Sequence, residues 1–197
     1  MPFLPAAAAV LALFAAVPAM ASPLKIDFET APSYASVGDH YAAQGVRFGG
    51  GAQGLQNDEL GPYFSNAPSP LGVMFAVDTD SAMNVASGFS GLFSFSYAST
   101  AAALGAVSIW SGLDGTGDRL ASFDLLGNSA GCTTGAGWCA FDTLSSSLAG
   151  VAYSVTFNGD SSIAFDDISL NTVPEPATLL LVSLALAGMA AGARRRK

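Results

Sequence analysis

Short runs in which apolar and polar residues alternate recur along the middle of this 197-residue chain. Leu24, Ile26 and Phe28 alternate with polar residues, and Leu92 to Tyr97 alternates aromatic residues with serines. A period of two places the apolar side chains on one face of a β-strand. Further strands are predicted at 46–48, 73–77, 106–110, 120–125, 152–157 and 162–170. Because no amphipathic helix competes, the pattern predicts an all-β antiparallel β-sandwich of jelly-roll type.

Composition excludes several classes of protein. The chain is 51% hydrophobic and 11% charged, which is too apolar for a disordered protein. Residues 22–172 hold three basic and fourteen acidic residues, a net charge of −11. Nucleic acid is therefore not expected as a partner, because phosphates require clustered Lys and Arg. One His and two Cys exclude most metal sites built from several His or from four Cys residues.

The first 21 residues resemble a secretory signal peptide. They are almost entirely apolar and end Ala19-Met20-Ala21, with small residues where signal peptidase needs them. We expect signal peptidase to cleave after Ala21. The alternative is a buried N-terminal helix.

Residues 173–197 combine three features in a fixed order. Pro174-Glu175-Pro176 can continue neither a strand nor a helix. An uncharged stretch, 177–193, follows, and as a helix it would be about 25 Å long, which suffices for a short transmembrane helix. The basic end, 194–197, is expected to stay in the cytoplasm and leave the body outside.

This end resembles the PEP-CTERM sorting signal, which is a Pro-Glu-Pro motif, a short apolar helix and a basic terminus. The resemblance implies recognition by an exosortase, an integral membrane transpeptidase that acts near Pro174-Glu175-Pro176. It also implies export by a Gram-negative bacterium that makes exopolysaccharide. The precursor would be anchored in the inner membrane with its body in the periplasm, and the protein would then reach the cell surface or the extracellular matrix. The alternative is a plain C-terminal anchor.

The domain predicted at 22–172 contains both cysteines. Cys132 and Cys139 are close in sequence, and in an oxidising compartment we expect them to form a structural disulfide. The bridge would hold a loop that contains Trp138, a possible glycan contact. Trp110 lies in an apolar strand and is expected in the core.

Acidic residues near both ends of the domain suggest a cation site. In a jelly roll the first and last strands often lie side by side, which would bring Glu29 and Asp167 together. The Phe28-Glu29 opening and the Asp166-Asp167 closing resemble those of carbohydrate-binding-module jelly rolls, many of which hold a structural Ca²⁺. That resemblance implies Glu29 and Asp167 as ligands, with Asp39 as a further one. The alternative is that these acids face water.

No catalytic constellation stands out. His40 is the single histidine, and no serine lies in a GxSxG sequence. We therefore expect a non-catalytic exported surface or matrix protein associated with exopolysaccharide or biofilm. One alternative is a glycan-binding module or adhesin that uses exposed Trp138 or tyrosines. Another is a polysaccharide hydrolase, which needs a pair of opposed carboxylates that the sequence does not single out.

Overall fold

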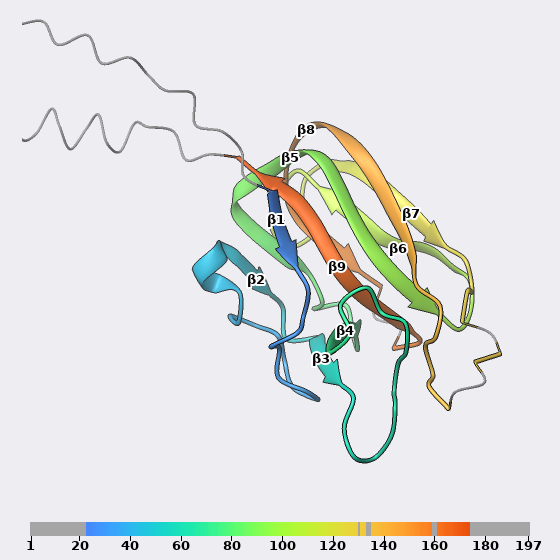
Figure 1. Cartoon of the computed structure of the whole chain (residues 1–197). Helices are drawn as coiled ribbons and strands as arrows, with labels where there is room; N and C mark the ends of the chain where they lie inside the picture. Colours follow the sequence, from blue (N-terminus) through green and yellow to red (C-terminus); the bar gives the residue numbers. More distant parts are fainter. Residues whose placement is uncertain (1–22, 130, 133–134, 159–160, 174–197) are drawn as a thin grey trace, which may run out of the picture. The chain divides into compact units, whose positions relative to one another are not determined.

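The computed structural model describes residues 23–129, 131–132, 135–158 and 161–173 (Figure 1). The predicted signal peptide, the Pro-Glu-Pro motif and the predicted transmembrane helix lie outside these residues. Within them, no helix is both long and apolar enough to span a bilayer. Residues Ala21–Glu175 form one compact unit.

The described residues form nine strands and one short 3₁₀ helix, η1 (Ala42–Gln44). The strands are β1 (Pro23–Ile26), β2 (Val46–Phe48), β3 (Ala52–Gln56), β4 (Gly72–Ala76), β5 (Met83–Ser99), β6 (Ala103–Trp110), β7 (Arg119–Leu125), β8 (Asp142–Phe157) and β9 (Ile163–Thr172). Every strand pairing is antiparallel. The prediction of an all-β antiparallel fold is thus confirmed.

Two long strands, β5 and β8, run through both layers of the fold. The first half of β5 pairs with β2 on one side and with the second half of β8 on the other. The second half of β8 in turn pairs with β6, and β6 pairs with β7. The second half of β5 pairs with β9 and with the first half of β8. The change from β2 to β9 as the neighbour of β5 occurs where the pairing of β5 with β8 has register shifts. In the same part of β5, Gly88 and Gly91 have φ of 77° and 75°. Positive φ is accessible to glycine, so these residues let the strand bend from one layer into the other (Figure 1).

The core lies between the two layers. Phe157 of the second half of β8 contacts Phe165 of β9, with ring centroids 4.8 Å apart. Phe95 of β5 contacts Phe123 of β7 edge to face at 5.1 Å. A smaller cluster of Leu55, Phe64, Val73 and Ala164 lies apart from this core. Both clusters belong to the Ala21–Glu175 unit, so the body has its own hydrophobic core.

Several predicted strands need revision. The sequence pattern missed β3 and the first halves of β5 and β8. The first and last strands do pair as predicted, with Leu24 opposite Leu170 and Ile26 opposite Ile168. Trp110 is half-buried and is not in the core cluster, and its ring N–H donates to Thr156 Oγ1 at 2.9 Å.

Candidate functional site

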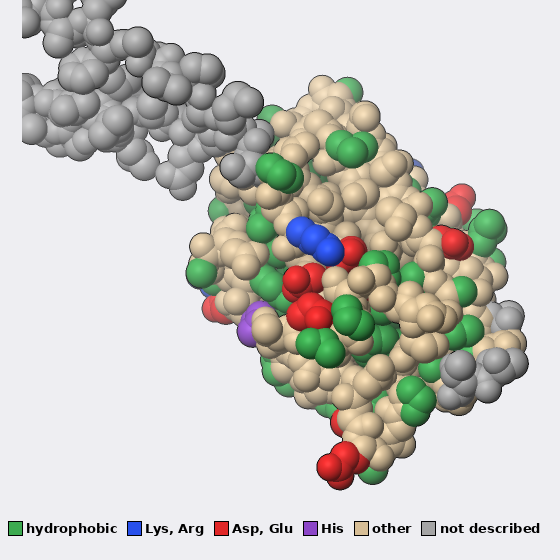
Figure 2. Space-filling view, in the orientation of Figure 1, with side chains coloured by type: hydrophobic (Ala, Val, Ile, Leu, Met, Phe, Trp, Pro, Cys, Tyr) green, Lys and Arg blue, Asp and Glu red, His purple; other side chains and the backbone are tan. Residues whose placement is uncertain are grey.

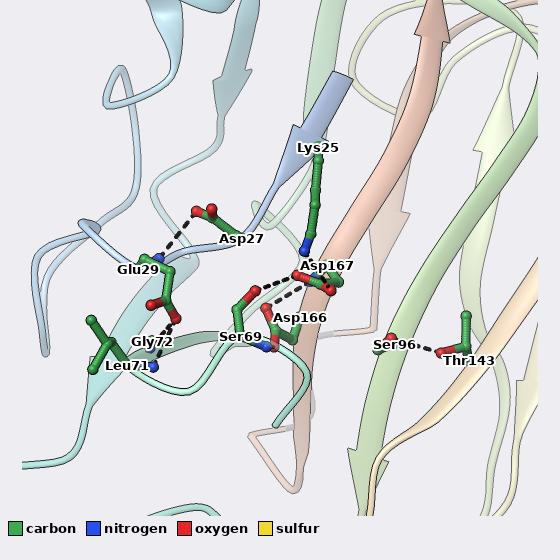
Figure 3. A network of polar contacts seen from close by, with 10 residues as sticks. All are labelled: Lys25, Asp27, Glu29, Ser69, Leu71, Gly72, Ser96, Thr143, Asp166 and Asp167. Carbon is green, nitrogen blue, oxygen red and sulfur yellow. Dashed lines mark hydrogen bonds and ion pairs between the residues drawn. The ribbon is translucent and has the colours of Figure 1, made fainter. Parts of the chain in front are cut away.

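A β-bulge in β9 creates the most unusual polar arrangement of the described chain. Ser94 of β5 pairs with Ser169 and Ser96 pairs with Asp166, so β9 has one extra residue in this interval. Asp167 lies in the bulge with φ of 50°, in the left-handed region. Asp166 is buried, and the bulge returns Ile168 to the core that Phe165 also contacts, while Asp167 lies beside Lys25 of β1 (Figure 3).

The two aspartates have different partners. Asp166 is fully buried and accepts hydrogen bonds from the backbone N–H groups of Ser69, at 2.8 Å, and of Asp167, at 2.7 Å. Asp167 forms an ion pair with Lys25 Nζ at 2.8 Å and accepts a hydrogen bond from Ser69 Oγ. Ser69 lies in the segment before β4, so β1, β9 and this segment meet at the pair (Figure 3).

Glu29 reaches the same region from the segment after β1. Phe28 has φ of 55°, which turns the chain out of the strand. The Glu29 carboxylate then accepts hydrogen bonds from the backbone N–H groups of Leu71, at 2.7 Å, and of Gly72, at 3.2 Å. A Cβ at residue 72 would lie 2.1 Å from the Phe28 carbonyl oxygen, so the close approach requires glycine.

Burial and like charge dominate the electrostatics here. Burial, followed by the nearby charges of Asp167 and Glu29, raises the pKa of Asp166 to about 7. The hydrogen bond with Asp167 raises the pKa of Lys25. Tyr41 packs beside this region, and burial raises the pKa of its hydroxyl to about 12. On this face, acidic side chains gather beside a basic one (Figure 2).

The predicted calcium ligands do not form one set in this arrangement. Glu29 and Asp167 belong to the region just described, but Asp39 forms an exposed ion pair with Arg47. The described residues contain no group of three or more His, Cys, Asp or Glu side chains placed to hold a metal ion. Because donors from the protein already engage Glu29 and Asp167, a cation there would have to compete with them. Calcium binding stays a prediction.

The predicted disulfide is confirmed, since Cys132 and Cys139 are bonded with their Cα atoms 5.7 Å apart. Trp138, within the same loop, is half-buried against the smaller hydrophobic cluster. Its ring N–H donates to the carbonyl oxygen of Ser162 at 2.7 Å. Trp138 therefore connects the disulfide loop to the body, and its ring nitrogen is not free for a ligand.

An exposed tyrosine, Tyr34, packs beside the half-buried Tyr63, a pair that the sequence could not single out. Tyr34 is 57% exposed and contacts Tyr63 edge to face, with ring centroids 5.7 Å apart. The Tyr63 hydroxyl donates to Asp58 Oδ1 at 3.1 Å, and the neighbouring Tyr34 and Asp58 raise the pKa of Tyr63. Tyr34 has φ of 54°, an uncommon conformation for a bulky residue. By contrast, Tyr41 and Tyr97 are buried.

The single histidine and the polar side chains of one surface cavity both have partners within the chain. His40 Nε2 lies 2.9 Å from Thr30 Oγ1, and its ring contacts Tyr41. A surface cavity of about 310 Å³ is lined by Ala42, Gly45, Arg47, Asn84, Ala86, Leu113 and Asp114. Asn84 and Asp114 exchange two hydrogen bonds at its margin, at 2.6 and 2.8 Å. Asn84 and Asp114 therefore satisfy one another, while Arg47 pairs with Asp39.

Comparison with solved structures finds distant similarity. The K2 cleaved adhesin domain of Lys-gingipain is 15% identical with a TM-score of 0.49, over 77% of this chain and 99% of that one. The C-terminal CBM6 of LamC from Zobellia galactanivorans is 15% identical with a TM-score of 0.39, over 77% and 100%. A family 29 carbohydrate-binding module from Piromyces equi is 12% identical with a TM-score of 0.40, over 77% and 92%. No curated protein matches the sequence.

The C-terminal segment gives a specific match. Residues 172–197 match the PEP-CTERM protein-sorting motif, over the same segment in which the sequence predicts the Pro-Glu-Pro motif, the apolar helix and the basic end. The motif implies an exported, membrane-passing precursor of a Gram-negative bacterium that an exosortase processes.

Proposed function

We propose that this chain is a non-catalytic exported protein that an exosortase sorts, and that its β-sandwich body then acts at the cell surface or in the exopolysaccharide matrix. The observation that carries the proposal is the match of residues 172–197 to the PEP-CTERM motif. The body is suited to such a setting, because it is stabilised by a disulfide, which persists in oxidising compartments.

Mass spectrometry of the mature protein tests the sorting step. The full-length chain is expressed in a Gram-negative host with and without an exosortase. With the exosortase, we expect a mature chain that starts at Ser22 and has lost the residues beyond the Pro-Glu-Pro motif. Glu175→Ala should abolish this processing, whereas Glu59→Ala, which alters an exposed residue of the body, should not. A chain that still ends in Lys197 in the exosortase host would overturn the proposal.

A second role, glycan binding by the body, is favoured by the pair formed by the exposed Tyr34 and the half-buried Tyr63. Aromatic rings offer an apolar face to sugar rings, and Asp58 beside them offers acceptors for sugar hydroxyls. The left-handed backbone at Tyr34 costs about 1 kcal/mol, and such strain tends to persist where a side chain has a task. This pair is a better candidate contact than Trp138, whose ring nitrogen is engaged.

A glycan array with the body, residues 21–175, tests this second role. Tyr34→Ala should abolish any specific signal, while Leu104→Ala, which removes another exposed apolar side chain, should leave it unchanged. An absent signal, or a signal that Tyr34→Ala does not change, would contradict glycan binding at this pair. Turnover of a bound polysaccharide would instead favour the hydrolase alternative.

A further inference from the structure

The first half of β8, residues 142–148, forms an open edge of the sheet. It pairs with β5 on one side, from Leu148 opposite Gly91 to Asp142 opposite Tyr97. No strand of the described chain pairs with its other side, so its backbone N–H and C=O groups are available there. The outward side chains of Thr143, Ser145 and Ser147 are exposed. Figure 1 shows this half of β8 on the opposite side of β5 from β9.

The other edges carry devices that discourage strand pairing. The outer side of β3 is bridged by Ser33 and Ser36. β2 is three residues long, and β7 carries the charged Arg119 and Asp124. Charges, short length and covering segments are the usual protection of sheet edges. Within residues 142–148 only Asp142, at the start of the strand, is charged, and there is no proline, so the rest of this edge lacks such protection.

Partly exposed apolar side chains lie beside the same edge. Leu144 and Leu148 of β8 pack against the core but remain half-buried, as does Phe123 of β7. Phe123 contacts Phe95, which is paired with Leu144, so these side chains lie close together between the two layers. A strand added to the edge would cover apolar surface as well as satisfy backbone groups.

We propose that residues 142–148 form an interface through which two copies of this chain pair edge to edge, antiparallel about a two-fold axis at Ser145. An antiparallel two-fold pairing of identical strands is self-complementary, so one surface suffices. Asp142 of each copy then lies opposite Leu148 of the other. The two Asp142 side chains are separated by six residues, about 20 Å along the strand, well beyond the screening length of about 8 Å at physiological salt. Repulsion between the two Asp142 side chains therefore does not oppose the contact.

Disulfide trapping tests the contact directly in the body, residues 21–175. In the proposed pairing, residue 145 lies opposite its own copy with Cα atoms about 4.5–5.5 Å apart, which a disulfide can bridge. We expect Ser145→Cys to give a covalent dimer on a non-reducing gel. Gln44→Cys places a thiol at another exposed position and should remain monomeric. Equal cross-linking of the two variants, or none, would overturn the proposal.

Sedimentation equilibrium provides the second test. The apparent molecular mass of the wild-type body should rise with protein concentration from the monomer mass to twice that mass. Ser145→Lys combined with Ser147→Lys adds positive charge to both copies at the contact, so this variant should remain monomeric. Both positions are exposed, so the substitutions should not disturb the fold. The control, Gln44→Lys combined with Leu104→Lys, adds the same charge elsewhere and should still dimerise. A wild-type monomer at every concentration, or a dimer that persists in the Ser145/Ser147 variant, would refute the interface.

Discussion

Asp166 makes the stability of the body depend on pH in an unusual direction. The side chain is fully buried, and its carboxylate is held by two backbone N–H groups. Burial, with the nearby charges of Asp167 and Glu29, raises its pKa from the ordinary 3.8 to about 7. The folded protein therefore binds this proton more tightly than the unfolded chain does. The resulting stabilisation is fully present below the unfolded pKa and is lost as the pH rises through about 7.

The size of the effect follows from the two pKa values. The difference between 3.8 and about 7 corresponds to about 4 kcal/mol of unfolding free energy. About 3 kcal/mol of this falls between about pH 5 and about pH 8, above the range in which ordinary carboxyl groups titrate. Asp166→Asn removes the titrating group, so its free energy of unfolding should change much less over this range.

Urea unfolding of the body, followed at a series of pH values, measures the effect. The quantity of interest is the free energy of unfolding of the wild type minus that of Asp166→Asn. We expect this difference to fall as the pH rises. Asp118→Asn, at an exposed position, serves as the control and should follow the wild type. A difference that is constant or rises with pH would refute the assignment of the titration to Asp166.

Three further predictions concern Trp138, Gly72 and calcium binding. Trp138→Ala should lower the free energy of unfolding by about 3 kcal/mol, because it removes packing and the hydrogen bond to Ser162. Urea unfolding measures this change, and a decrease below about 1 kcal/mol would contradict a structural role for Trp138. Gly72→Ala should destabilise the body by about 2 kcal/mol or more, since its Cβ would overlap the Phe28 carbonyl, and a neutral result in the same assay would exclude that approach. If calcium binds as predicted, millimolar calcium should raise the Tm relative to EDTA, and Asp167→Asn should remove the rise; an unchanged Tm would contradict the site.

The all-β class was predictable because apolar residues alternate in the strands that bury one face. Phe93, Phe95 and Tyr97 show the pattern and lie in the core. The alternation fails where a strand buries little. The first half of β8 contains mainly small polar residues and lies at an edge, so it has no apolar period to detect. The disulfide was also predictable, because its partners are only seven positions apart.

The candidate site was predictable only in part. The adjacency of the first and last strands brings Glu29 and Asp167 into one region, as expected. The bulge was not foreseeable, because strict alternation would place Phe165 and Ile168 on opposite faces, whereas both lie in the core. Asp39 pairs with Arg47 instead of joining the other acids. These outcomes depend on register and loop path, which no local pattern encodes.

The sequence by itself determined the strand-rich character of the body, the disulfide and the C-terminal sorting motif, since each depends on residues that are close together along the chain. Only the tertiary structure decided that Asp166 is buried, that Trp138 is held by Ser162, and that Tyr34 is exposed beside Tyr63. It also decided which strand edge is open. The physical reason is that burial and pairing depend on neighbours distant in sequence, and one extra residue in β9 is enough to exchange the buried and exposed sides of a strand.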